Sequence, residues 1–449
     1  MQAKTNRLFL YKATATAALG GLLFGYDTAV IAGAIGFLKT KYELNPAMEG
    51  WVASCALIGC IIGAMFSGTL SDKIGRKKVL MICALLFAVS SIGTGMSDLN
   101  AFIFFRIMAG IAIGTASMVS PMYISEIAPA DKRGSLVSIN QLGVVTGILV
   151  IYFVNAYIAH LYNDAWNVST GWRWMFASGA IPSVIFMLAL ITVPESPRWL
   201  AKQGQWDKAK NILSRINGQQ KADEEIKEIK DALSDEPESF GELFKPGLRL
   251  ALIIGILLCI FSQVTGINAI MYYAPEIFKA TGDGSGSALL QTVLVGAVNL
   301  LFTLVAIKFV DTVGRKKLLL IGIAGMALCL LTVGAAFYFH AEKGFLVLIA
   351  ILAYIAFFEI SLGPLTFVVI AEIFPNKVRG RAMSITIFAL WSAVFLVSQT
   401  FPILKDGIGV GNTFWIYMIM AFAAFVFVWK MVPETKGKTL EEIEKTWHR

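Results

Sequence analysis

Long, continuously apolar runs recur along the chain from one end to the other. Each is about 20 residues long, enough to cross the ~30 Å hydrocarbon core of a bilayer at ~1.5 Å per residue. Apolar and polar positions do not alternate within them, so we expect helices and not strands. The pattern predicts twelve membrane-spanning helices, near residues 9–37, 50–71, 79–97, 100–125, 135–160, 172–193, 249–278, 287–310, 317–339, 345–372, 380–403 and 412–431.

The composition agrees with a membrane protein. Hydrophobic residues make up 57% of the chain and charged residues only 15%, whereas soluble domains carry about 25% charged residues. The first apolar run contains Asp27 and continues to Phe37 without a cleavage-type site. We therefore expect the first run to stay in the protein as a span and not to act as a cleaved signal peptide.

The net charge of +8 is distributed unevenly. With the N-terminus assigned to the cytoplasm, the outside loops hold only five basic residues, Lys39, Lys41, Lys279, Lys343 and Lys405. This asymmetry follows the positive-inside rule and predicts that both termini are cytoplasmic. The basic balance therefore reflects topology, and we expect no nucleic-acid partner.

Residues that carry catalytic chemistry are scattered. The five cysteines all lie in apolar runs without a nearby second cysteine, which favours packing roles, and the three histidines show no metal-ligand spacing. Motifs of metalloproteases, serine hydrolases and P-loop nucleotidases are absent from the sequence. We expect no metal, no cofactor and no enzymatic activity.

One long polar stretch, from about Pro194 to Arg249, interrupts the apolar runs. Its mixed charges and a stripe of Ile226, Ile229 and Leu233 predict short amphipathic helices at the cytoplasmic face. The predicted division is a six-helix half (1–193), a cytoplasmic helical linker (194–248), a second six-helix half (249–432) and a cytoplasmic tail (433–449).

Three motifs occur once in each half, in the same order. The segment 72–78 returns at 311–317 and Pro194-Glu195-Ser196 returns as Pro433-Glu434-Thr435, both at an offset of 239, while 125–134 returns at 371–380 at an offset of 246. Nearly constant offsets indicate a duplication. The predicted fold is an all-α membrane protein of two pseudo-symmetric halves, the architecture typical of secondary transporters.

Asp27 and Arg106 are charges inside spans that the duplication does not explain, because neither has a charged counterpart in the second half. At ~1.5 Å per residue, both lie about 10 Å below the outer surface of a ~30 Å core. Charges at that depth are costly unless paired, so we expect a pair. The pair is either a static structural contact or a proton relay in which Asp27 titrates.

Amides inside spans are the second unusual feature. They donate and accept hydrogen bonds at once and so match sugar hydroxyls, while an aromatic face suits a sugar ring. The candidates are Gln141, Gln263, Asn268 and Asn299, with the aromatic residues Phe24, Tyr272, Tyr273 and Trp391. Each alone could instead join neighbouring helices. Glu359, near a helix break expected at Gly363-Pro364, is either a second proton site or a structural hydrogen-bonding group.

The pattern Gly-x-x-x-Asp-x-x-Gly-Arg-Lys-Lys from Gly68, with the runs 194–199 and 433–438, resembles the sugar porter family of the major facilitator superfamily. The stretches 19–30 and 117–126 are similar in particular to the bacterial xylose–proton symporters of that family. The resemblance covers essentially the whole chain.

The resemblance implies roles for individual residues. Asp27 and Arg106 would couple proton movement. The sugar site would comprise Phe24, Gln141, Gln263, Asn268, Tyr272, Asn299, Gly363, Phe367 and Trp391. Charges at the cytoplasmic helix ends are either solvated or form an ion-pair network that latches the two halves in the outward-open state. The charged residues are Asp72, Arg76, Glu126, Arg133, Glu195, Asp311, Arg315, Glu372, Arg379 and Glu434, and Gly75 belongs to the same gating motif. Ser262, Phe367 and Leu390 depart from the family, which commonly has amides at the first and third positions and Trp at the second.

We therefore expect proton-coupled symport of a monosaccharide, a pentose or hexose, across the cell membrane. The partners would be the sugar, the proton and the lipid bilayer, with the monomer as the functional form. A facilitative uniporter is the first alternative, which Asp27 argues against. A sugar sensor is the second, although such sensors carry long cytoplasmic tails.

Overall fold

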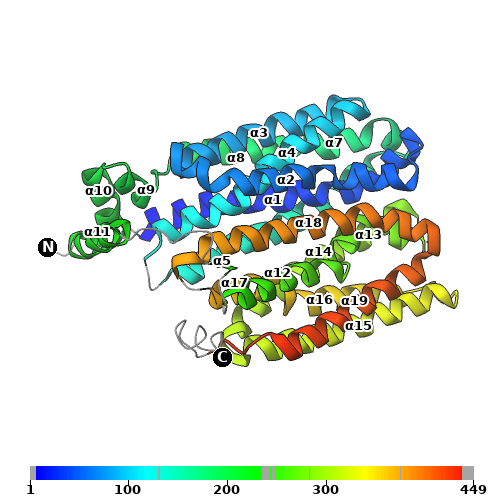
Figure 1. Ribbon diagram of the computed structural model, residues 1–449. Helices are drawn as coiled ribbons and strands as arrows, with labels where there is room; N and C mark the ends of the chain where they lie inside the picture. The colour runs from blue at the N-terminus through cyan, green and yellow to red at the C-terminus, as the bar shows by residue number, and fades with distance from the viewer. Residues whose placement is uncertain are drawn as a thin grey trace. The chain divides into compact units, whose positions relative to one another are not determined.

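The computed structural model describes residues 7–129, 132–234, 243–244, 248–282, 284–374 and 376–436 (Figure 1). Within these residues the secondary structure is helical and no strand occurs. Twelve helical segments are long and apolar enough to cross a membrane. The predicted all-α fold and the twelve predicted spans are confirmed.

The first six spans are built from nine helical elements. They are α1 (Arg7–Tyr42), α2 (Pro46–Ile74), α3 (Arg76–Met96), α4 (Leu99–Ile127), α5 (Arg133–Leu161), and then α6 (Asp164–Trp166), the π-helical turn η2 (Asn167–Gly171), α7 (Trp172–Ala177) and α8 (Ala180–Ile191), which together form the sixth span. The helices extend beyond the predicted spans because an apolar run marks only the part of a helix that contacts lipid.

The last six spans are built from eight helices. They are α12 (Leu248–Val264), α13 (Ile267–Lys279), α14 (Ser285–Val313), α15 (Arg315–Tyr338), α16 (Leu346–Glu359), α17 (Leu362–Ile373), α18 (Asn376–Ile408) and α19 (Val410–Met431). The seventh span is α12 followed by α13, and the tenth is α16 followed by α17. The sequence predicts the break in the tenth span, near Gly363-Pro364, and the structure places it a few residues earlier, between Glu359 and Leu362. The break in the seventh span is absent from the sequence prediction, which treated 249–278 as a continuous run.

The polar stretch between the spans folds into α9 (Pro197–Lys202), α10 (Trp206–Asn217) and α11 (Gln219–Ser234), which confirms the predicted amphipathic helices. Their apolar faces form one small core of Leu200, Ala201, Ala209, Leu213, Ala222 and Ile229. Ile226 packs against this core, as its place on the predicted stripe requires. The side chain of Leu233, the third residue of the stripe, lies outside the description.

The chain separates into two compact units. The first unit contains α1 up to Thr28, the chain from Ile58 to Ile148, and the described residues from Phe176 onward through the linker helices. The second contains the segments Ala29–Leu57 and Leu149–Met175 together with the described residues of the C-terminal part. Helix α3 packs against α4 and α8 in the first unit, and α15 against α16 and α19 in the second.

Glycines allow the closest helix contacts in the first unit. A side-chain carbon at Gly25 would overlap the carbonyl oxygen of Val144, so α1 and α5 approach closely there. In the same way, a side-chain carbon at Gly114 would overlap the carbonyl oxygen of Cys60, which brings α4 close to α2. Small residues allow this approach in lipid, where close packing replaces the hydrophobic effect as the driving force. These contacts pack α1 against α5 and α4 against α2, in the unit that holds the buried charges described next.

Candidate functional site

The Asp27 and Arg106 side chains form a buried ion pair between α1 and α4. Nη1 of Arg106 lies 3.1 Å from Oδ2 of Asp27 and also donates to the Asp27 carbonyl oxygen at 3.3 Å. Arg106 is 2% exposed and Asp27 8%. The pairing predicted from the cost of a lone buried charge is confirmed. The relay role of the pair stays a prediction.

Beyond Asp27, few contacts surround the Arg106 guanidinium. The Arg106 guanidinium lies 5.3 Å from the ring centre of Phe176. Its Nε is buried and has no hydrogen-bond partner among the described residues. The polar contacts of Arg106 thus go to Asp27. The Phe176 ring lies against the guanidinium as well. Asp27 is the one anionic partner of Arg106 among the described residues, so its protonation would leave a buried cation without a counter-charge.

The break between α12 and α13 exposes polar backbone within the seventh span. Gly266 has φ of 94°, a left-handed conformation that favours glycine. The Tyr417 ring packs against it so closely that a side-chain carbon would overlap, and the Tyr354 hydroxyl donates to the carbonyl oxygen of Thr265 at 3.0 Å. Irregular backbone inside a membrane is tolerated where protein groups satisfy it, and transporters use such breaks at their binding sites.

A chain of side-chain hydrogen bonds lies beside this break. Nδ2 of Asn268 donates to Oε1 of Gln263 at 2.5 Å, and Nε2 of Gln263 donates to Oγ of Ser262 at 3.0 Å. Ser262 in turn donates to the Cys259 carbonyl oxygen at 2.7 Å. Two predicted sugar-site amides are therefore in direct contact. Ser262 was noted in the sequence only as a departure from the family, and it orients Gln263.

Asn299 meets the third carboxylate inside the spans. Its Nδ2 donates to Oε1 of Glu359 at 3.0 Å, and the Thr303 hydroxyl donates to Oε2 at 2.9 Å. Glu359 ends α16 and is 5% exposed, and a side-chain carbon at Gly363 would lie 3.2 Å from its Oε2. These contacts support the structural alternative for Glu359, because its two oxygens accept hydrogen bonds from α14 beside the break between α16 and α17.

The remaining predicted sugar-site residues divide between the two units. Phe24 and Gln141 are half-buried in the first unit. In the second, Tyr272 and Trp391 are each 5% exposed, whereas Phe367 is 44% exposed. Leu390 is buried. Within the second unit the structure joins Gln263 to Asn268, and Asn299 to Glu359; the wider sugar site stays a prediction.

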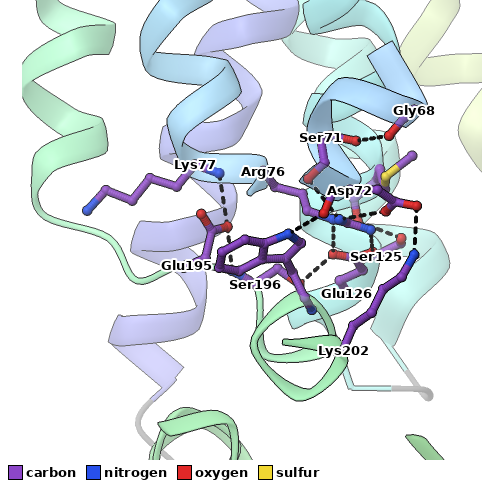
Figure 2. Close-up of polar contacts among 12 residues, drawn as sticks. Gly68, Ser71, Asp72, Arg76, Lys77, Ser125, Glu126, Glu195, Ser196 and Lys202 are labelled. Carbon is purple, nitrogen blue, oxygen red and sulfur yellow. Dashed lines mark hydrogen bonds and ion pairs between the residues drawn. The ribbon is translucent and has the colours of Figure 1, made fainter. Parts of the chain in front are cut away.

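The repeated charges of the first unit form a compact network at the start of α3 (Figure 2). Arg76 pairs with Glu126 through two hydrogen bonds of 2.9 Å and with Oδ1 of Asp72 at 2.9 Å. Ser196 donates to Glu126, and Lys202 pairs with Asp72 at 2.8 Å. The bidentate geometry makes the Arg76–Glu126 contact stronger and more directional than a single ion pair.

Glu195 closes the same network from the linker. Its Oε1 accepts the backbone N–H of Lys77 at 3.0 Å, at the start of α3 where free N–H groups attract a carboxylate. Gly75 precedes the helix with φ of 102°, and a side-chain carbon there would overlap Oε2 of Glu195. The glycine of the repeated motif is thus required both by its backbone conformation and by the carboxylate beside it.

The second unit repeats this geometry. Arg315 pairs with Oε1 of Glu372 at 2.9 Å, and Glu434 accepts the backbone N–H of Arg315 at 3.0 Å. Thr435 donates to Oε2 of Glu372 at 2.5 Å, as Ser196 does to Glu126. Gly314 has φ of 104°. The duplication read from the sequence is therefore present in the side-chain contacts as well.

Three residues predicted for this network are placed differently or not described. Arg133 is exposed and donates to the carbonyl oxygen of Ser125 at 3.1 Å. The side chains of Asp311 and Arg379 lie outside the description. Conversely, Ser196 and Thr435 were not predicted to take part. Their signal was in the repeat, since both are hydroxyl residues that follow the Pro-Glu pair.

Comparisons with known proteins place the chain in one family. A family model described as "Sugar (and other) transporter" matches residues 13–447. The arabinose-proton symporter of Bacillus subtilis (strain 168) is 49% identical over 441 residues, covering 98% of this chain and 95% of that protein.

Solved structures agree. The partially occluded inward open conformation of the xylose transporter XylE from E. coli matches with a TM-score of 0.87 at 42% identity, over 96% of this chain and 100% of that chain. The proton:xylose symporter XylE bound to 6-bromo-6-deoxy-D-glucose matches with a TM-score of 0.81 at 42% identity, over 98% and 100%.

Proposed function

This chain belongs to the sugar transporter family, and from that membership we propose that it moves a monosaccharide across a cell membrane in symport with a proton, by alternating access. The relatives whose names record proton symport of arabinose and of xylose support both the sugar class and the coupling. The protein is a transporter and not an enzyme.

The observation that carries proton coupling is the buried Asp27–Arg106 pair. A symporter needs a group that takes a proton from one side and releases it to the other, and that changes the energy of a conformation when it does. Asp27 is the carboxylate in the first unit that meets this need. It lies inside a span and pairs with the Arg106 side chain, which is only 2% exposed. Its protonation would release Arg106 and favour a different packing of α1 against α4.

The sugar-binding part of the proposal rests on the amides of the second unit. Gln263 and Asn268 satisfy part of each other's hydrogen bonding, which leaves one N–H of each and an oxygen of Asn268 for a ligand. Asn299 has a buried Oδ1 with no partner among the described residues. An acceptor held in that way suits a donating sugar hydroxyl. Gln141, Phe24, Tyr272, Gly363, Phe367 and Trp391 complete the proposed site.

The repeated networks would act in alternating access and not in sugar contact. Each described network lies inside one unit, so it holds the start of α3 or α15 to the segment that follows the sixth or twelfth span. We place these helix starts at the cytoplasmic surface, with both termini on the same side. The two six-helix halves would rock against each other as bodies, with the monomer as the working form and the bilayer as its surroundings.

Uptake by purified protein in proteoliposomes tests the function. Arabinose, xylose and glucose would each be offered with and without a pH gradient, acid outside. We expect at least one of them to accumulate above its outside concentration only when the gradient is present. Equilibration without accumulation would identify a uniporter, and binding without entry of any sugar would identify a sensor; either result would contradict the proposal.

A further inference from the structure

Four charged side chains gather where α1 ends, α2 begins and α18 ends. Nζ of Lys39 lies 2.7 Å from Oε2 of Glu49, and Nζ of Lys405 lies 4.0 Å from Oε1 of the same carboxylate. Asp406 closes the group, at 4.0 Å from Lys39 and 3.9 Å from Lys405. One carboxylate from α2 thus lies between an ammonium group from α1 and one from α18.

Glu49 differs from ordinary surface charges because it is 0% exposed. A carboxylate removed from water is stable only while its cationic partners remain beside it. The duplication does not explain this residue, since the corresponding positions 288–295 hold no charged residue. Neither the buried pair of Asp27 nor the repeated networks contact it. The proposed transport mechanism therefore leaves Glu49 without a role.

Neighbouring contacts hold α2 directly against α18. The Ser54 hydroxyl donates to Oε1 of Gln399 at 3.0 Å, and Nε2 of Gln399 donates to the Ala47 carbonyl oxygen at 2.9 Å. A side-chain carbon at Gly50 would overlap the carbonyl oxygen of Gln399. The two helices are therefore in close contact on both sides of Glu49 along α2, in agreement with the burial of its side chain.

The cluster lies at the end of the helices opposite to the repeated networks. Helix α2 carries Glu49 in its first turn and Asp72 in its last, about 35 Å apart at ~1.5 Å per residue. Helices α1 and α2 belong to the N-terminal half and α18 to the C-terminal half. With the networks at the cytoplasmic surface, the cluster joins the two halves at the outer surface.

From these contacts we propose that Lys39, Glu49, Lys405 and Asp406 form an outer ionic latch, which keeps the extracellular ends of α1, α2 and α18 together. The latch rests on the proposed transport function, because outside sugar enters only if these ends separate. When α18 moves away, Lys405 and Asp406 leave with it and water reaches Glu49. The latch then makes the outward-open state less populated than it would be with a neutral residue at this position.

Accessibility of a thiol at position 54 tests the latch without requiring transport. Ser54 is 0% exposed and lies at the α2–α18 contact, so Ser54→Cys reports separation of these two helices. A membrane-impermeant maleimide would be applied to intact cells from outside. The five native cysteines are buried, and the parent protein gives their background labelling.

We expect Glu49→Gln to raise the labelling rate about tenfold, equal to about 1.4 kcal/mol in the conformational equilibrium. Glu43→Gln is the matched control, because Glu43 is exposed, lies in the same outer turn and makes no ion pair with the described residues. Its labelling should equal the parent's. The exchanged pair, Glu49→Lys with Lys39→Glu, should label more slowly than Glu49→Gln alone.

Equal labelling in the Glu49→Gln and Glu43→Gln variants overturns the latch. If Glu49→Gln does not fold, Lys39→Gln replaces it, since Lys405 still accompanies the carboxylate; a smaller rise is expected, and no rise overturns the proposal. Raised labelling in a protein that moves no sugar would contradict the transport function and leave the latch standing. Unchanged labelling in a protein that transports sugar would contradict the latch and leave the transport function standing.

Discussion

The Asp27 carboxylate couples the proton to the sugar in this mechanism, and a neutral isostere separates the two. Asp27→Asn keeps the shape and a hydrogen bond to Arg106 but cannot take up a proton. We expect sugar counterflow to continue, because exchange needs no net proton movement, and accumulation to be lost. One proton moving down ~150 mV supplies ~3.5 kcal/mol, or ~300-fold accumulation, so the loss is easily measured. A variant that still concentrates sugar would refute the relay.

Ser262 tests the orientation of the proposed sugar site. Ser262→Ala removes the acceptor that Nε2 of Gln263 uses at 3.0 Å, and a net hydrogen bond is worth about 0.5–1.5 kcal/mol. We expect sugar binding by calorimetry to weaken about two- to tenfold. Ser183→Ala is the control, because Ser183 is also buried but bonds only to the carbonyl oxygen of Gly179. Equal affinities in both variants would remove Ser262 from the site.

Sequence reasoning found the Asp27–Arg106 pair because a buried charge must have a partner and few candidates share its depth. It did not find that Glu359 accepts a hydrogen bond from Asn299, because many polar groups are possible partners for a carboxylate and only the packing of α14 against α16 selects one. Ser262 was read as a lost amide, and its bond to Gln263 depends on a side-chain rotamer that no pattern records.

Gly266 separates α12 from α13, and the break depends on it for two reasons. Its φ is 94° and the Tyr417 ring leaves no room for a side chain. Gly266→Ala should therefore lower the melting temperature in detergent, by strain of about 1–3 kcal/mol, and weaken sugar binding. Gly407→Ala is the control, since Gly407 lies in α18 with nothing within 4 Å. An unchanged melting temperature in the first variant would show that the break tolerates a side chain.

The starts of α3 and α15 should control the conformational balance. Arg76 is 6% exposed and pairs with Glu126 and Asp72, so Arg76→Ala leaves two carboxylates close together without their shared cation. Combined with Arg315→Ala, it should favour the inward-open state with little change in intrinsic sugar affinity. Cysteine labelling from each side measures the shift.

Lys78→Ala is the control for that pair, because Lys78 is exposed beside the same motif. A labelling pattern shared by the double variant and this control would mean that the networks do not bias the two states.

The twelve spans were predictable because lipid demands a continuous apolar surface about 20 residues long. The break after Glu359 was predictable from Gly363-Pro364, whereas the break after Val264 was not, because an interrupted helix has the same apolar run as an intact one. Gly266 allows that break, and distant groups such as the Tyr354 hydroxyl, which donates to the Thr265 carbonyl oxygen, satisfy the backbone there. The sequence predicted that the linker forms amphipathic helices, because Ile226 and Ile229 are apolar at helical spacing.

The molecule as a whole combines a duplicated scaffold with features that the duplication does not supply. The networks around Arg76 and Arg315 share the arginine–glutamate pair, the hydroxyl donor to that glutamate and the carboxylate at the helix start. This repetition suits a transporter in which two similar halves move against each other. The buried Asp27–Arg106 pair and Glu49 have no counterparts. In the proposed mechanism the repeated networks take part in the motion of the halves, the Asp27–Arg106 pair couples the proton, and Glu49 closes the outer side.

Proton movement evoked by sugar tests the central claim most directly. Proteoliposomes in weakly buffered medium would receive an outside pulse of the transported sugar, with no pH gradient imposed, while an outside electrode records pH. Symport predicts that the medium becomes alkaline as protons enter with the sugar, and that Asp27→Asn proteoliposomes admit sugar in counterflow without this change. Sugar entry by the parent protein with no alkaline shift would contradict proton symport and identify a uniporter.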